Sequence, residues 1–196
     1  MLQSPVVRFG FLRRLPSLDH YEFARHWRTV HGPLVAGLEG FTTFTERYIQ
    51  NHLIEGEDSS WIDGVSMTHQ RAREDYSAGF FEHADVLHSQ NDELHFLDTR
   101  NSEFYMGPRR VLRQSPEGAH KIIVLAESDA IEESVPYASR LSITRALDAD
   151  ENAKLCIVEA WFSDEDAATR VLQTVRRNAK IRGVVQVNEV QQFPKE

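Results

Sequence analysis

Features that would attach this chain to a membrane, to nucleic acid or to an oxidising compartment are missing from its sequence. The single cysteine, Cys156, cannot form an internal disulfide, and its apolar neighbours are typical of a buried thiol. No apolar run approaches the length of a membrane span, and no signal peptide is visible before Arg8. The formal net charge of −8, from 22 basic and 30 acidic residues, argues against nucleic-acid binding and against a polybasic membrane patch. We therefore expect a cytoplasmic protein with neither nucleic acid nor membranes among its partners.

Sequence signatures of cofactor and metal chemistry are missing as well. The chain has no phosphate-binding loop, dinucleotide-binding fingerprint, serine nucleophile elbow or zinc motif. The acidic run at 55–58 lacks the regular ligand spacing of a calcium loop. His83, His88 and His95 are scattered without the spacing of a metal signature. We therefore expect neither a metal nor a cofactor.

The most informative stretch that is present, residues 18–35, has the pattern of an amphipathic helix. Asp19 fits its N-cap, with a carboxylate three residues later. Apolar residues recur at helical spacing, namely Phe23, Trp27, Val30 and Leu34. Gly32-Pro33 predicts the end of the helix, which places His31 at or near its C-terminus. There the helix dipole favours a protonated imidazole, so His31 either caps the last carbonyls or serves as an acid–base group.

Alternating apolar and polar residues predict strands around this helix. In the first half these strands cover residues 6–12, 43–52 and 101–112, and residues 61–69 fit a turn at Asp63-Gly64 that leads into the third strand. Tyr48 and His52 share one face of the second strand with other polar residues, which favours a barrel lumen over a helix-packing face. Met67 and His69 share a face of the third strand. Arg8 lies mid-strand, where it either pairs with a carboxylate or anchors a substrate.

The second half repeats the order of the first after a turn-rich linker at 114–119. Strands are predicted at 121–126, 141–147, 155–162 and 184–193, with a short helix at 131–140 and a longer one at 163–177. Ser163 fits the N-cap of the longer helix. The repeated order indicates an internal duplication, with one unit at 1–114 and a diverged unit at 119–196.

Two spaced motifs resemble the EthD family of dimeric α/β-barrel proteins. The first is Phe23…Trp27…His31-Gly32-Pro33-Leu34-Val35, and the second is Tyr48-Ile49-Gln50-Asn51-His52. The chain departs from the family pattern at His26, where a tyrosine is usual, and at Met67 and His69, where Glu and Trp are usual. The segment 159–162 is similar to the family's third strand. The resemblance implies an α+β fold in which two tandem ferredoxin-like βαββαβ units form an α/β barrel with face-to-face antiparallel sheets. It also leads us to expect a homodimer.

Function is predicted from the same resemblance together with the acid–base residues. It implies a cofactor-independent lyase or isomerase acting on a small cyclic or aromatic carbonyl compound, as in aromatic or polyketide metabolism. We expect His31 to transfer the proton and Tyr48 to donate a hydrogen bond to the developing oxyanion, with His69 as a further catalytic residue. The expected substrate-binding residues are Arg8, His52, Met67 and Trp161. Haem binding through a histidine, known in other branches of the superfamily, and non-catalytic binding of a small ligand remain alternatives.

Overall fold

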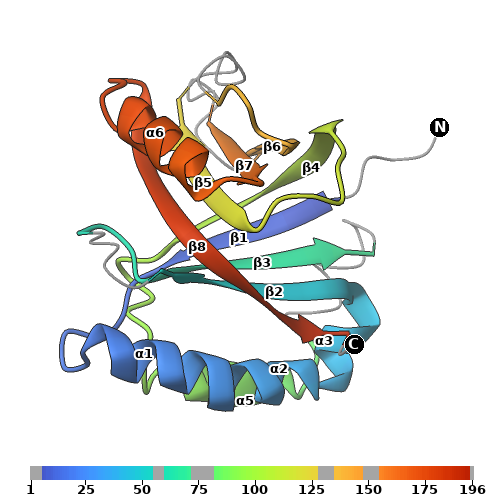
Figure 1. Ribbon diagram of the computed structural model, residues 1–196. Coiled ribbons are helices and arrows are strands. Elements are labelled where there is room, and N and C mark those ends of the chain that lie inside the picture. Colours follow the sequence, from blue (N-terminus) through green and yellow to red (C-terminus); the bar gives the residue numbers. More distant parts are fainter. Residues whose placement is uncertain (1–5, 55–59, 72–81, 128–134, 148–154, 195–196) are drawn as a thin grey trace. The chain divides into compact units, whose positions relative to one another are not determined.

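Eight strands close a barrel in the computed structural model, which describes residues 6–54, 60–71, 82–127, 135–147 and 155–194 (Figure 1). The strands are β1 (Val6–Leu12), β2 (Thr45–Leu53), β3 (Gly64–Gln70), β4 (Glu103–Arg113), β5 (His120–Ala126), β6 (Arg140–Arg145), β7 (Cys156–Phe162) and β8 (Ile181–Phe193). Their hydrogen-bonded order is β1-β3-β2-β8-β5-β7-β6-β4. The helices are α1 (His20–His26), η1 (Trp27–His31), α2 (Gly32–Ala36), α3 (Glu39–Phe44), α5 (Val86–Glu93) and α6 (Glu165–Val175). The α+β barrel predicted from the sequence is therefore confirmed.

The chain folds as two compact units, which we name the N-unit and the C-unit. The C-unit lies mainly in Tyr105–Asn188. The N-unit comprises Pro5–His52, Ser59–Phe104 and the end of β8 from Glu189 onward. The domain boundaries 1–114 and 119–196 stay a prediction.

The N-unit contains an antiparallel sheet of β1, β3 and β2, with helices along one side of it (Figure 1). Phe9 and Ile49 both pair with Met67, so these three side chains lie on one face of the sheet. Residues on the opposite face, Arg8, Tyr48 and Thr68 among them, face the helices. Between sheet and helices lies a buried apolar cluster made of Leu12, Phe23, Trp27, Phe96 and Leu97.

The first helix of the N-unit starts as predicted but continues further. Asp19 accepts a hydrogen bond from the Glu22 amide at 2.7 Å, and the Glu22 carboxylate accepts one from the Asp19 amide at 2.9 Å. The helix does not end at Gly32-Pro33, because a widened π turn, in which the Gly32 N–H donates to the Trp27 carbonyl, leads into α2. A proline is tolerated at the first positions of a helical segment, where it lacks no needed N–H. His31 is therefore inside a helix and not at its C-terminus, and the predicted dipole effect does not apply.

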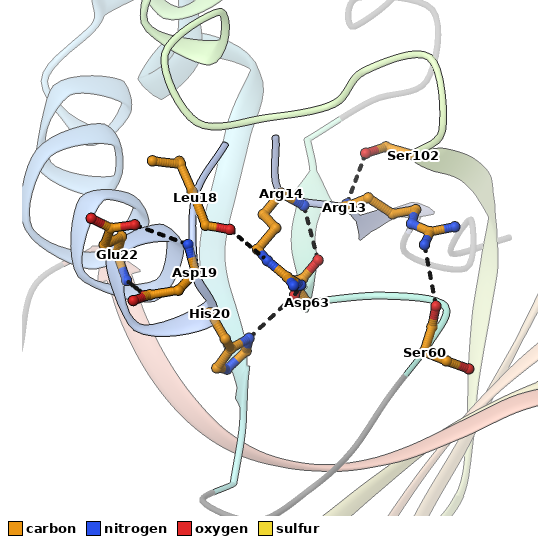
Figure 2. Close-up of polar contacts among 9 residues, drawn as sticks. All are labelled: Arg13, Arg14, Leu18, Asp19, His20, Glu22, Ser60, Asp63 and Ser102. Carbon is orange, nitrogen blue, oxygen red and sulfur yellow. Dashed lines mark hydrogen bonds and ion pairs between the residues drawn. The ribbon is translucent and has the colours of Figure 1, made fainter. Parts of the chain in front are cut away.

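A buried carboxylate joins the end of β1, the start of α1 and the turn before β3. Asp63 accepts hydrogen bonds from the Arg14 amide at 2.9 Å, from the Arg14 guanidinium and from His20 Nδ1 at 3.3 Å (Figure 2). Burial alone would raise the pKa of Asp63, but these hydrogen bonds and the charge of Arg14 lower it. The sequence indicated only a turn at Asp63-Gly64, whereas the carboxylate also fixes where the first helix begins relative to the sheet.

The C-unit packs α6 against the sheet of β5, β7 and β6. Alternate residues of β5 and β7 form the buried cluster under this helix, including Ile122, Val124, Val158, Ala160 and Phe162. The N-cap of α6 is Asp164 and not Ser163, because the Asp164 carboxylate accepts a hydrogen bond from the Asp166 amide at 3.0 Å. On the opposite face, Lys121 pairs in register with Trp161, and Glu159 lies next to them.

Three further predictions concern element bounds. Residues 43–44 end α3, so the second strand begins at Thr45. Of the polar helix predicted within 72–100, the structure describes α5, whereas 72–81 lie outside the described residues. Of the helix predicted at 131–140, residues 131–134 also lie outside them, and Arg140 begins β6.

Across the described ranges, no helix has the length and apolarity that a membrane crossing requires.

Candidate active site

A cavity of about 260 Å³ lies within the N-unit, between the helix-facing side of the sheet and the helices. Its apolar walls come from both layers and include Leu12, Trp27, Val35, Phe41, Phe96 and Phe104. Four ionisable side chains also line it: Arg8 from β1, His31 from η1, Tyr48 from β2 and Glu93 from α5. Apolar walls with a few convergent polar groups are typical of small-molecule sites.

His31 is held in the cavity wall by a carboxylate from α5. Its Nδ1 lies 2.9 Å from Asp92 Oδ2, and its ring centroid lies 4.9 Å from that of Phe96. Because a carboxylate can only accept, Nδ1 carries the proton and Nε2 keeps a free lone pair. Burial, which leaves His31 7% exposed, lowers its pKa, and the opposing effect of Asp92 does not overcome this. A neutral imidazole with a basic Nε2 is therefore the prevailing form near neutral pH.

Asp92 binds a second histidine through its other oxygen. His26 Nε2 lies 3.0 Å from Asp92 Oδ1, and the His26 ring stacks on Phe96 at a centroid distance of 4.9 Å. Asp92 therefore links two rings from successive turns of the first helix. His26 is the position where the chain departs from the usual tyrosine of the EthD pattern, so this linked arrangement depends on that departure.

Tyr48 lies against the helices, so the prediction that its face of β2 points into a barrel lumen is wrong. The Trp27 indole N–H and the Gln50 side-chain amide both donate to the Tyr48 hydroxyl, at 3.2 and 3.1 Å. Buried donors and acceptors from the helix layer satisfy the polar residues of this face, which is why their polarity misled the prediction. Burial raises the pKa of Tyr48 to about 12, so the hydroxyl stays protonated at neutral pH.

Gln50 connects this face to the first helix. Its side-chain Nε2 also donates to the Trp27 carbonyl at 2.7 Å, and its Oε1 accepts from Gln192 at 3.1 Å. His52 Nε2 lies 3.0 Å from the same oxygen, and its ring contacts Trp27 at a centroid distance of 4.6 Å. A Cβ at Gly32 would come within 2.6 Å of the Gln192 side chain and 2.7 Å of Gln50 Nε2, so a larger residue there would displace these two side-chain amides. His52 thus supports Trp27 and is not among the residues that line the cavity.

Arg8 and Glu93 are the charged groups of the cavity. The Arg8 guanidinium lies over the Phe104 ring, 4.4 Å from its centroid. Burial raises the pKa of Glu93, and the charge of Arg8 opposes this rise without cancelling it. Arg8, predicted as a substrate-binding residue, lines the cavity, and its binding role stays a prediction.

Met67 and His69 do not face this cavity, and Trp161 belongs to the other unit. Met67 lies on the opposite face of the sheet, as does His69, which pairs with Arg47. Trp161 belongs to the C-unit, where Lys121 Nζ and the Arg140 guanidinium lie 4.6 and 3.6 Å from its ring centroid. The predicted convergence of Met67 and His69 with Tyr48 is therefore wrong, whereas the place of Trp161 in the site stays a prediction. Sequence reasoning also missed Asp92, whose polar surroundings in 72–100 contain no pattern that distinguishes it.

The sequence pattern of the EthD domain matches residues 15–100, a range that contains His31, Tyr48 and Asp92. Residues 15–100 thus have the sequence pattern of an EthD domain. No curated protein matches the chain by sequence. The EthD domain therefore supplies three of the four ionisable groups of the cavity, and Arg8 precedes it on β1.

Solved structures share the fold of the whole chain at low sequence identity. A mutant chlorite dismutase from Candidatus Nitrospira defluvii, in complex with cyanide, superposes with a TM-score of 0.56 at 11% identity, covering 98% of this chain and 93% of the other. A protein named "Putative monooxygenase" from Fusobacterium nucleatum gives a TM-score of 0.55 at 6% identity, covering 98% and 94%. At these identities the likeness shows the fold. Within the described residues, no group of three or more His, Cys, Asp or Glu side chains could hold a metal ion.

Proposed function

We propose that the EthD domain binds a small organic molecule in the cavity beside His31 and exchanges a proton with it. One observation carries this proposal: a histidine whose Nδ1 is fixed by Asp92 at 2.9 Å lines a mostly apolar cavity of about 260 Å³. An engineered apolar cavity of roughly 150 Å³ is sufficient for benzene, so this one accommodates a substituted single ring.

The finer proposal is a cofactor-independent lyase or isomerase. Nε2 of His31 takes a proton from a carbon next to a carbonyl, and the electron pair moves to the carbonyl oxygen. Asp92 keeps the imidazole in the tautomer that can accept this proton and stabilises the imidazolium that forms. Tyr48, which stays protonated, is the donor available to the oxygen that gains charge. Binding of the small molecule without turnover is the competing function. A measurement of proton exchange separates binding from catalysis, because a protein that only binds does not accelerate the exchange.

Haem binding is the other candidate, because branches of the superfamily use a histidine ligand. The donor chemistry of His31 fits, since a carboxylate that accepts Nδ1–H leaves Nε2 for a metal. The space does not fit: about 260 Å³ is below the roughly 300–1,000 Å³ of pockets for drug-sized ligands, and haem is larger than most of these. The cavity is therefore too small for haem.

Proton exchange with a neutral probe tests the proposal. The purified protein is incubated in D₂O with 4-acetylbenzamide, and deuterium entering the acetyl methyl group is followed by NMR. Wild type should accelerate the exchange, and His31→Ala should slow it by about 10²- to 10⁴-fold, mainly in turnover and not in KM. The rate should fall as pH drops through a pKa below 6.5, because protonated His31 cannot act as a base.

The matched control is His88→Ala, which removes an exposed histidine from α5 and should leave the exchange rate unchanged. Equal rates for wild type and His31→Ala would reject the role of His31. A Soret band after incubation with haemin would instead favour the haem alternative. The expected homodimer is a separate proposal, and light scattering that gives the mass of one chain would reject it.

A further inference from the structure

We infer that the ligand of this cavity is an anion that also carries a carbonyl-type oxygen, with Arg8 binding the anionic group and Tyr48 donating a hydrogen bond to the oxygen. This inference rests on the proposed function and names its substrate class. It follows from two features of the cavity: the direction of the hydrogen bonds around Tyr48, and the surroundings of Arg8.

Tyr48 can only offer its proton to a ligand. The Trp27 indole nitrogen has no lone pair to accept with, so it donates to the Tyr48 oxygen at 3.2 Å. The second contact comes from Gln50 Nε2, which has two hydrogens and also donates to the Trp27 carbonyl at 2.7 Å. These two donors occupy both lone pairs of the Tyr48 oxygen. In the part of the chain that the structure describes, no acceptor lies within hydrogen-bond distance of its hydrogen.

The direction of these bonds is fixed by groups outside the cavity. Gln50 Oε1 accepts from Gln192 Nε2 at 3.1 Å, and Gln192 Nε2 in turn donates to the Arg28 carbonyl at 3.2 Å. Reversing either amide would set a nitrogen donor against another donor, or an oxygen against a backbone carbonyl. The network is therefore arranged before a ligand arrives, and it selects a ligand atom that accepts a hydrogen bond.

Arg8 offers a positive charge in the same cavity. Its guanidinium carbon lies 4.4 Å from the Phe104 ring centroid, and among the described residues its N–H groups have no hydrogen-bond partner, so they can bind a ligand. Among the described residues, no carboxylate lies within ion-pair distance of Arg8. Glu93 is the other charged group in the wall, and burial raises its pKa, which reduces its repulsion of an anion. A carboxylate matches the planar fork of Arg8.

Three probes of one size separate the two contacts. The first, 4-acetylbenzoate, has both groups; 4-acetylbenzamide lacks the negative charge, and 4-isopropylbenzoate lacks the carbonyl. Affinities are measured by tryptophan fluorescence or calorimetry for wild type, Arg8→Gln, Arg8→Lys and Tyr48→Phe. The matched control is Arg100→Gln, which removes an exposed arginine. Because each comparison is a ratio within one variant, partial unfolding of a variant does not change the result.

Wild type should bind 4-acetylbenzoate roughly ten- to a hundredfold more tightly than 4-acetylbenzamide, since hydrogen bonds between charged groups are the strong ones. Arg8→Gln should abolish this ratio, Arg8→Lys should keep part of it, and Arg100→Gln should keep all of it. Tyr48→Phe should remove a preference of about tenfold for 4-acetylbenzoate over 4-isopropylbenzoate.

Equal wild-type affinities for the acid and the amide would overturn the inference. If 4-acetylbenzamide still exchanges its methyl protons in that case, the proposed function stands and only the substrate class is wrong. A charge preference that survives in Arg8→Gln would place the anion elsewhere and also reject the inference. Failure of all three probes to bind would reject the inference and the proposed function together.

Discussion

Glu159 in the C-unit should be one of the largest single contributors to stability. Its side chain is 1% exposed, accepts hydrogen bonds from Arg109 Nε at 2.9 Å and the Ser142 hydroxyl at 3.0 Å, and forms an ion pair with Lys121 Nζ at 2.9 Å. Burial alone would raise the pKa of Glu159, but the charges of Lys121 and Arg109 and their hydrogen bonds lower it to about 2. Replacing Glu159 by glutamine keeps the volume and removes the charge that these two cations surround.

The size of the effect follows from the pKa. Lowering it from 4.5 to about 2 means that ionised Glu159 stabilises the folded state by about 3 kcal/mol at neutral pH. Glu159→Gln should therefore lose about 3 kcal/mol of unfolding free energy at pH 7, within the roughly 3–5 kcal/mol measured when one partner of a buried ion pair is removed. Because the folded pKa is depressed, this contribution is complete above the unfolded pKa and disappears as pH falls from about 4.5 towards 2.

Urea unfolding of wild type and Glu159→Gln at pH 7 and at pH 3.5 measures both parts of this prediction. The difference between the two proteins should shrink at pH 3.5 by about 1 kcal/mol, since the slope is about 1.36 kcal/mol per pH unit below the unfolded pKa. Glu46→Gln, which neutralises an exposed glutamate, should change stability little at either pH. A difference in unfolding free energy under about 1 kcal/mol at pH 7, or one independent of pH, would show that the charge of Glu159 does not stabilise the fold through Arg109 and Lys121.

Two further predictions concern the carboxylates of the N-unit. Asp63→Asn should lower the free energy of unfolding in urea by about 1–2 kcal/mol, a modest loss because the Arg14 side chain is partly exposed and its charge is screened. The pKa of Asp63 in the folded protein lies below its usual 3.8, so this loss should diminish as pH falls below 3.8. An unchanged unfolding midpoint would contradict this prediction. Asp92→Asn should lower the pKa of His31 further in an NMR titration, since the charge that favours the imidazolium is gone while burial remains. A pKa of His31 that rises in this variant would count against the assigned pairing.

Local chemistry in the sequence was sufficient for several elements of the fold. The capping box at Asp19 predicted where the first helix begins, because the hydrogen bonds that satisfy its free N–H groups come from neighbouring residues. The apolar run at 155–162 predicted β7 within one residue. His31 and Tyr48 were predicted from the spaced EthD motifs, and both line the cavity.

The tertiary structure alone decided which side of the sheet is the site. A period of two separates the faces of a strand, but it does not say which face meets the helices. Tyr48 and Gln50 looked suited to a lumen because they are polar, yet the Trp27 indole and carbonyl satisfy them within the helix-packed layer. Met67 and His69 were assigned to the same site from strand alternation, but the antiparallel register places them on the other face of the sheet.

Long-range contacts also decided the state of His31. The sequence placed it at a helix end, where the dipole would favour its charged form, but a π turn carries the helix past Gly32-Pro33 to Ala36. Burial in the cavity wall then lowers the pKa of His31, and Asp92, 61 positions further along the chain, fixes its tautomer. Desolvation and a hydrogen bond between distant segments arise only when those segments pack together, so no local pattern in the sequence encodes them.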